Sequence, residues 1–233
     1  MSISEVPISG RTPGRQVLSP SQEDYLKQIF LLGNGVESVS TRDLSVRLDV
    51  RPASVTGMVQ RLAEAGLVIY EPYRGVILTD AGRRVALEML RHHRLLETFL
   101  EKMLGYGWDE VHDEAERLEH VISERFEARI AESLGHPTRD PHGDPIPDAN
   151  LRLPATAREI ELTQMAAGAV ARLSRVGTQD RDSLNLLSKL GLIPGVTVEV
   201  LGTVEGAVRV AIERDRFLLP RELADELWFQ EDV

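Results

Sequence analysis

Two imidazoles and two carboxylates recur at helical spacing near the middle of the 233-residue chain. His112, Glu116, Glu119 and His120 stand at i, i+4, i+7 and i+8. In one continuous helix these side chains spread over about 100° of one face, where they can converge on a metal ion. The alternative is an acidic helix in which abundant glutamate produces such spacings by chance, so a second group of ligands is needed to decide.

That second group lies earlier in the chain. His93 and Glu97 stand at i, i+4 on another predicted helix, and Asp24 lies on an earlier helix still. Because the chain has no cysteine, any metal must be held by oxygen and nitrogen. Such ligands suit Mn(II), Fe(II), Co(II) or Zn(II) better than a thiolate-seeking ion.

Composition and charge narrow the class of protein. With 42% hydrophobic and 27% charged residues, the chain is long enough for one large domain or two or three small ones. It has no apolar signal region and no run of about 18 apolar residues, so we expect a cytoplasmic protein that does not enter a membrane. Of the net charge of -10, residues 92–150 carry -8. The near-neutral first third can bind DNA if its arginines gather on one face.

The first third of the chain has the pattern of a winged helix-turn-helix domain. A capping-box start at residues 19–22 opens a helix that the glycines of residues 33–35 end. Two short helices follow, joined by a turn at residues 49–52, as in a helix-turn-helix motif. Two apolar runs around the turn at residues 71–75 then predict a hairpin, which would be the wing.

The second helix of such a motif enters the major groove by its N-terminal end, and the wing can reach phosphate or the minor groove. Arg51 and Gln60 could bond base edges, and Ala53 could contact a thymine methyl group. The alternative is a winged helix that binds another protein. The predicted DNA contacts are Arg51, Pro52, Ala53, Ser54, Thr56, Gly57 and Gln60, with Tyr73 and Arg74 on the wing.

The remaining sequence predicts two helices, a linker and a small β domain. A long helix from about residue 80 to 104 is apolar on more than one side, which favours a homodimer interface. An acidic helix is predicted from about residue 109 to 134. The Pro-rich residues 136–157 are typical of a tether between domains rather than of a folded element. Alternating apolar residues from about 160 onward predict short strands in a partly open barrel.

Together these features resemble the diphtheria toxin repressor family of iron- and manganese-dependent transcriptional regulators. The most specific matches are Val111-His112-Asp113-Glu114, Glu119-His120 and the string from Asp140 to Pro147. The resemblance implies a mainly α protein with a small β content. Its implied parts are a flexible N-terminal arm (1–18), a winged helix-turn-helix DNA-binding domain (19–80), a helical metal-binding and dimerisation domain (81–135), a Pro-rich tether (136–157) and an SH3-like, FeoA-like barrel (158–233).

The resemblance also implies two metal sites. The primary site matches at Asp24, Glu116, Glu119 and His120, and the ancillary site matches at His93, Glu97 and His112. Some members add ligands from the barrel, and the nearest positions here are Asp180 and Ser183.

Two positions bear on the metal that the resemblance implies. Iron-type members carry Met and Cys where this chain has Asp24 and Glu116, whereas manganese-type members carry carboxylates. Hard oxygen ligands favour Mn(II), so we predict Mn(II) as the effector, with Fe(II) as the alternative and Co(II) as a mimic. Lys27 stands where the shortest manganese regulators have a second carboxylate. We therefore expect two separated sites rather than a two-metal cluster.

The sequence thus predicts a homodimeric, manganese-dependent regulator that binds a palindromic DNA operator and represses metal-uptake genes when Mn(II) is plentiful. An iron-responsive repressor of the same family is the alternative. A metalloenzyme is the rival class, but the chain has no His-Glu-x-x-His, no nucleophile motif and no phosphate loop. A winged-helix regulator that responds to a small molecule instead of a metal leaves the His/Glu groups unexplained, and we expect no small-molecule substrate.

Overall fold

The computed structural model describes residues 18–155 and 158–230. Apart from Leu18, the predicted N-terminal arm lies outside these residues. The described chain forms two compact units. One holds the residues up to His92 together with Leu118–Ser133, and the other holds His93–Arg117 and the residues from Leu134 onward. Among the described helices, none combines the length and the apolar character that a membrane span requires.

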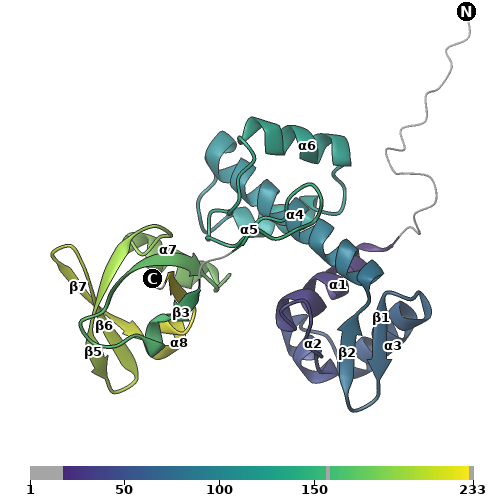
Figure 1. The fold of residues 1–233 in the computed structure, drawn as a ribbon, viewed down its shortest axis with the longest axis horizontal. Helices are drawn as coiled ribbons and strands as arrows, with labels where there is room; N and C mark the ends of the chain where they lie inside the picture. Colours follow the sequence, from purple (N-terminus) through teal and green to yellow (C-terminus); the bar gives the residue numbers. More distant parts are fainter. Residues whose placement is uncertain (1–17, 156–157, 231–233) are drawn as a thin grey trace, which may run out of the picture. The chain divides into compact units, whose positions relative to one another are not determined.

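The first unit contains the predicted winged helix-turn-helix (Figure 1). Its first helix, α1 (Pro20–Leu32), starts at the predicted capping box, in which the Ser19 hydroxyl accepts from the Gln22 amide and the Gln22 side chain accepts from the Ser19 amide at 3.0 Å. The wing is an antiparallel pair in which Val68 lies opposite Leu78. The other elements are α2 (Thr41–Arg47), α3 (Pro52–Glu64), β1 (Val68–Glu71) and β2 (Gly75–Leu78).

The long helix α4 (Asp80–Leu104) is attached to the wing through its first turn. The Thr79 hydroxyl accepts from the Gly82 amide at 3.2 Å and donates to the Leu67 carbonyl at 3.0 Å. A Cβ atom at Gly82 would lie 2.0 Å from that same Leu67 carbonyl oxygen. Only glycine therefore fits where α4 crosses the start of the wing.

The prediction of one acidic helix from about residue 109 to 134 is wrong. The structure has two helices there, α5 (Val111–Leu118) and α6 (Glu124–Ser133). Residues 119–123 form a turn between them. Glu119 and His120 therefore lie in this turn, beyond the end of α5, and not on one continuous helix with His112 and Glu116 as their spacing predicts.

Ser123 supplies a local reason for the break. Its hydroxyl accepts from the Phe126 amide at 3.3 Å, and its carbonyl accepts from the Glu127 amide at 2.9 Å, as an N-cap residue does. Serine bonds neighbouring backbone groups in this way outside a helix, so it favours a new helix start over continuation of the old helix.

The Pro-rich segment predicted as an unfolded tether is in part a packed element of the second unit. Asp140, His142 and Ile146 are buried, and the Arg94 guanidinium of α4 donates to the Pro145 carbonyl at 2.6 Å. Gly143 has a φ of 90°, and a Cβ there would lie 2.0 Å from the Ser174 carbonyl oxygen. Proline and glycine form tight turns as well as linkers, and composition alone does not distinguish the two.

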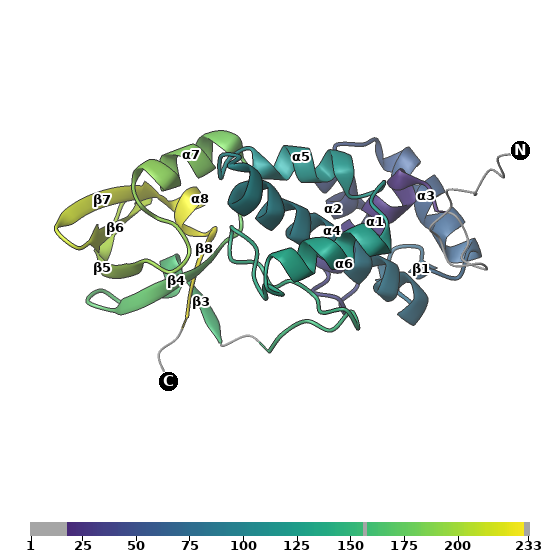
Figure 2. The ribbon, with the colours of Figure 1, turned by 90° about the horizontal axis from the view of Figure 1, so that it is seen from above.

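The C-terminal part of the second unit is the predicted small β domain (Figure 2). Its strands form one antiparallel sheet in the order β3-β8-β4-β5-β6-β7. Leu173, Val198 and Phe229 are fully buried in its core, together with Leu184 and Leu187 of α7. The elements are β3 (Glu159–Glu161), a 3-10 turn (Leu162–Gln164), β4 (Val170–Val176), α7 (Arg181–Lys189), β5 (Thr197–Val204), β6 (Ala207–Ile212), β7 (Asp215–Pro220), α8 (Arg221–Ala224) and β8 (Leu227–Gln230).

Replacing Gly82 by alanine should lower the midpoint of thermal unfolding, because the new methyl group would force α4 or the Leu67 backbone to move. Overpacking of this kind costs about 1–3 kcal/mol. The matched control is Gly57→Ala in α3, where an added Cβ meets nothing within 4 Å. Alanine is a better helix former than glycine by about 1 kcal/mol, so the control should raise the midpoint. Circular dichroism melts of the full-length chain measure both changes, and equal effects would contradict the steric account.

Candidate metal centres

The first candidate centre brings together α1 and the turn after α5, all within the first unit. Asp24, Glu119 and His120 each offer one ligand atom, and these atoms lie within 4.8 Å of one another. His120 Nε2 is 3.0 Å from Asp24 Oδ1 and 3.5 Å from Glu119 Oε1. The group can hold a divalent cation through two carboxylates and one imidazole, a donor set without sulfur.

His120 lies between carboxylates on both sides of its ring. Its Nδ1 atom lies 2.9 Å from Glu23 Oε2, and because an ionised carboxylate can only accept, Nδ1 must carry a proton. Asp24 first, and then Glu23, raises the pKa of His120 to about 10, against the effect of burial. The Nε2 atom thus faces Asp24 with either a proton or a metal ion between them. The contact with Glu23 is the carboxylate–histidine pairing that orients metal-binding imidazoles.

Two other side chains hold Glu119 in place. Lys27 Nζ lies 2.5 Å from Glu119 Oε1, and His92 Nδ1 lies 3.1 Å from the Glu119 carbonyl oxygen. The other ring nitrogen of His92 is 3.0 Å from Glu127 Oε2, and Arg91 Nε is 2.6 Å from Glu127 Oε1. Burial acts to lower the pKa of His92, but Glu127, the Glu119 carbonyl and Glu88 together outweigh it and raise that pKa. A chain of polar contacts therefore connects Glu119 to α6.

The second candidate centre lies in the second unit and contains the predicted ancillary ligands. His93 Nε2 is 3.0 Å from Glu97 Oε1 and 3.0 Å from His112 Nδ1, and His112 Nδ1 is 3.2 Å from Glu97 Oε1. Two atoms that bind one ion at about 2.1 Å, with angles near 90–110°, lie about 3.0–3.4 Å apart. The three side chains are therefore already spaced as the ligands of a shared ion.

A third group shares Glu97 with the second and was not predicted from the sequence. The potential ligand atoms of Glu97, Asp140 and His142 lie within 4.8 Å of one another, and all three residues are buried. His142 Nε2 is 3.0 Å from the Trp108 carbonyl, which only accepts, so this nitrogen carries a proton. In the neutral ring Nδ1 is then a bare acceptor. It lies 3.9 Å from Glu97 Oε1 and has no hydrogen-bond partner among the described residues.

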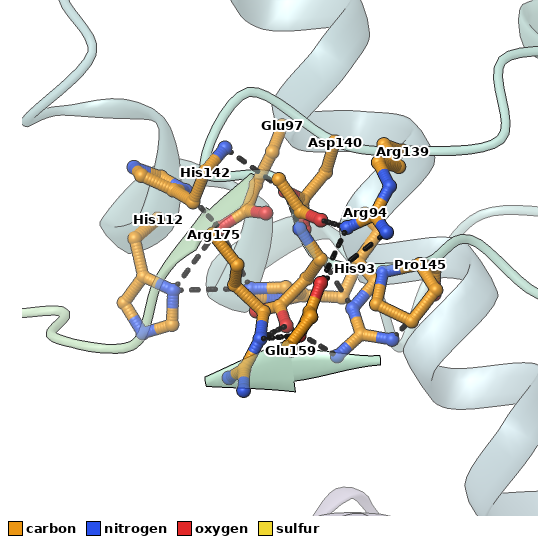
Figure 3. Close-up of polar contacts among 12 residues, drawn as sticks. His93, Arg94, Glu97, His112, Arg139, Asp140, His142, Pro145, Glu159 and Arg175 are labelled. Atoms are coloured by element: carbon orange, nitrogen blue, oxygen red, sulfur yellow. Dashed lines mark hydrogen bonds and ion pairs between the residues drawn. The ribbon is translucent and has the colours of Figure 1, made fainter. Parts of the chain in front are cut away.

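Figure 3 shows Glu97, Asp140 and His142 with the polar side chains around them. Burial acts to raise the pKa of Glu97, but His93 and then His112 hold that pKa well below its usual value. Burial, followed by the charges of Glu97 and Asp144, raises the pKa of Asp140 well above its usual value, although Arg94 Nε lies 3.6 Å from Asp140 Oδ2. A bound cation would favour the ionised form of Asp140. The buried acceptors of this region thus fit a metal ion.

Two residues predicted as ligands lie outside these groups. Glu116 belongs to the second unit, whereas Asp24, Glu119 and His120 belong to the first, and Glu116 Oε1 is 4.0 Å from His112 Nε2. Asp180 caps α7, where its Oδ2 atom accepts from the Ser183 amide at 2.9 Å. The roles of Glu116 and Asp180 as ligands remain predictions.

Sequence reasoning missed Glu23, Asp140 and His142. For Asp140 and His142 a signal was available, because Asp-x-His-Gly-Asp places two acids and an imidazole within five residues. In the sequence alone, that string indicates only the resemblance to the family. For Glu23 no signal separates it from other acidic residues near a helix start, since only the fold places it beside His120.

The predicted DNA contacts lie at the start of α3 and at the tip of the wing. Pro52 is the first residue of α3, and Val55 and Val59 are buried on the opposite side of the helix. Tyr73 is fully exposed at the wing tip, and Arg74 Nη1 lies 3.1 Å from Glu71 Oε2. At the start of α3 the exposed residues are the N-cap Arg51 and Pro52, Ala53 and Ser54. Thr56 and Gly57 are half-buried, and Gln60, farther along the helix, is exposed.

Comparison with known proteins covers most of the chain. Residues 17–76 match the N-terminal DNA binding domain of iron dependent repressors, residues 79–148 match their metal binding and dimerisation domain, and residues 160–230 match the FeoA domain. The chain is 34% identical over 228 residues to the iron-dependent repressor IdeR of Mycobacterium bovis, a match that covers 89% of this chain and 95% of the relative.

Two further matches are also to transcriptional regulators. The HTH-type transcriptional regulator MntR of Lysinibacillus sphaericus is 38% identical over 114 residues, covering 49% of this chain and 81% of the relative. A solved structure described as a manganese-dependent transcriptional repressor complex with manganese is 40% identical and has a TM-score of 0.84, covering 91% of this chain and all of that chain. The metalloenzyme alternative fails, because these are repressors and not enzymes. The chain therefore belongs to the iron-dependent repressor family of DNA-binding, metal-dependent transcriptional repressors.

Proposed function

We propose that this protein represses transcription in response to Mn(II), and that it does so as a homodimer on a palindromic operator that controls metal uptake. The observation that supports Mn(II) is the set of ligand atoms in the first centre. Asp24, Glu119 and His120 offer hard oxygens and one imidazole. Mn(II) is the weakest binder in its series, so a site that responds to it depends on hard ligands and geometry rather than on affinity alone. Fe(II) is the second candidate, because IdeR is an iron-dependent repressor.

The first centre gives the mechanism that we propose. Asp24 belongs to α1 of the DNA-binding part, whereas Glu119 and His120 belong to the turn that precedes α6. The ion would supply the positive charge that these buried acceptors need. With it bound, Asp24 and His120 hold α1 against the turn, and α1 packs on α2, which packs on α3. Metal and DNA then favour the same arrangement, so each should tighten binding of the other.

The proposed partner is double-stranded DNA, bound in the cytoplasm. The start of α3 would enter the major groove, and the exposed wing would reach the backbone. A two-fold dimer presents two such helices, and its operator should therefore be a palindrome with half-sites about one helical turn, or a multiple of it, apart.

Selection from random duplex DNA tests the metal requirement and the operator symmetry together. The full-length protein with Mn(II) should enrich a two-fold symmetric sequence, and excess chelator should abolish binding to it, because Asp24, Glu119 and His120 then share no metal ion. Binding should also weaken steeply as salt rises, since phosphate contacts displace counterions. Equal operator affinity with Mn(II) and with chelator would refute the proposal, and enrichment of an asymmetric site would refute the palindrome.

The metal preference is tested by Asp24→Met, which exchanges a hard oxygen for a thioether. The variant should respond less to Mn(II) relative to Co(II) and anaerobic Fe(II), because soft ligands favour later or softer ions. The measurement is the concentration of each metal that gives half-maximal operator binding. Glu116→Cys is the companion variant, since Glu116 is a predicted ligand outside the Asp24 group. If Asp24→Met keeps the parent's order of metals, Asp24 does not set the selectivity.

The second centre is tested by the double variant His93→Gln, Glu97→Gln. Loss of both side chains should reduce the number of Mn(II) ions bound per chain and weaken operator binding without abolishing it, because Asp24 and His120 still link α1 to the turn. Equilibrium dialysis measures the stoichiometry, and fluorescence anisotropy measures the DNA affinity. An unchanged stoichiometry would show that these residues hold no ion.

A further inference from the structure

One contact in the first centre is unusual for a place that should receive a cation. Lys27 Nζ lies 2.5 Å from Glu119 Oε1, and the side chains are only 4% and 0% exposed. Lys27 follows Asp24 by three residues on α1, so both residues lie on the same face of the helix. A protein cation therefore already lies against one of the carboxylates that the metal would use.

The oxygen atom that contacts Lys27 also faces the proposed metal-binding nitrogen. Glu119 Oε1 is 3.5 Å from His120 Nε2, which is 3.0 Å from Asp24 Oδ1. An ion bound by these residues would share Glu119 with the ammonium group. The two positive charges would then compete for the same carboxylate in a buried place, where charges interact more strongly than in water.

Burial explains why a resident cation is useful before the metal arrives. Glu119 is 1% exposed, and a buried carboxylate without a partner is strongly destabilising. Lys27 neutralises it and connects α1 to the same turn that the metal would connect. An ion bound at Nε2 would displace a proton from His120 and leave the ring neutral. The carboxylates of Glu23, Asp24 and Glu119 and the Lys27 ammonium then carry a charge of two minus, which matches a divalent ion.

We propose that Lys27 is a resident cation of this centre, which holds the metal-free protein together and sets the metal concentration at which the centre fills. This inference rests on the proposed function, since it assumes that Asp24, Glu119 and His120 bind the ion. Lys27 is a positioning and threshold residue rather than a ligand. A purely structural lysine would affect only the stability of the metal-free protein.

The test compares full-length Lys27→Gln, Lys27→Met and Lys27→Arg with the parent. Loss of the charge should tighten Mn(II) binding at this centre by about tenfold, because one repulsive charge is removed beside a divalent ion. It should also lower the melting temperature of the metal-free protein, because the buried Glu119 carboxylate loses its contact with the Lys27 ammonium group. Lys27→Arg keeps the charge and should restore affinity toward the parent's value. The electron paramagnetic resonance signal of free Mn(II) gives the dissociation constants, with the second centre removed by His93→Gln and Glu97→Gln in every variant.

Arg83→Gln is the matched control for a lost cationic contact on α1. Arg83 Nη1 donates to the Gly35 carbonyl at 2.6 Å, and its guanidinium carbon lies 5.5 Å from the centroid of the Phe30 ring. The control should lower the metal-free melting temperature and leave the Mn(II) dissociation constant unchanged.

The outcomes separate this inference from the proposed function. If the parent chain binds no Mn(II), the proposed function fails. If the parent binds Mn(II) but Lys27→Gln and Lys27→Met bind it equally well or more weakly, the inference about Lys27 alone fails. If a charge-free variant unfolds without metal, Mn(II) should refold it at concentrations no higher than those that saturate the parent. Failure to refold under those conditions also overturns the inference.

Discussion

Buried imidazole nitrogens and carboxylate oxygens lie close together in both units, and such contacts require a proton or a cation between the two atoms. His120 lies between Glu23 and Asp24, and Glu97 contacts His93 and His112. In water these groups would be solvated separately, but in the folded chain each needs a proton, an ammonium group or a metal ion. Folding and protonation are therefore coupled in these centres, and binding of a metal ion there would be coupled to both.

A resident ammonium group changes what the metal has to do in the first centre. Because Lys27 already bridges α1 and Glu119, the centre does not depend on metal for all of its cohesion. The ion then adjusts an existing contact between α1 and the turn after α5 instead of creating one. A repressor built in this way can respond to a change in metal concentration through a small rearrangement. The metal-free and metal-bound arrangements then need to differ in free energy by only a few kcal/mol.

The second unit builds its centre partly from backbone contacts to the C-terminal sheet. The Val176 amide at the end of β4 donates to the His142 carbonyl at 2.9 Å, and Gly143 packs against the Ser174 carbonyl. The position of His142 beside Glu97 thus depends on strand β4 as well as on α4. The C-terminal sheet therefore helps to position a residue of the second centre. The predicted barrel ligand, Asp180, instead caps α7.

The sequence alone was sufficient for the winged helix, the long α4, the small β domain and the grouping of His93 with Glu97, because capping residues and apolar periods act over a few neighbouring residues. It also indicated Glu119 and His120, but with the wrong geometry, since the cap at Ser123 breaks the helix that their spacing suggested. Glu23, Asp140 and His142 join the centres only through contacts between residues 34 to 97 positions apart. Such contacts depend on how helices pack and turns close, which tertiary structure decides.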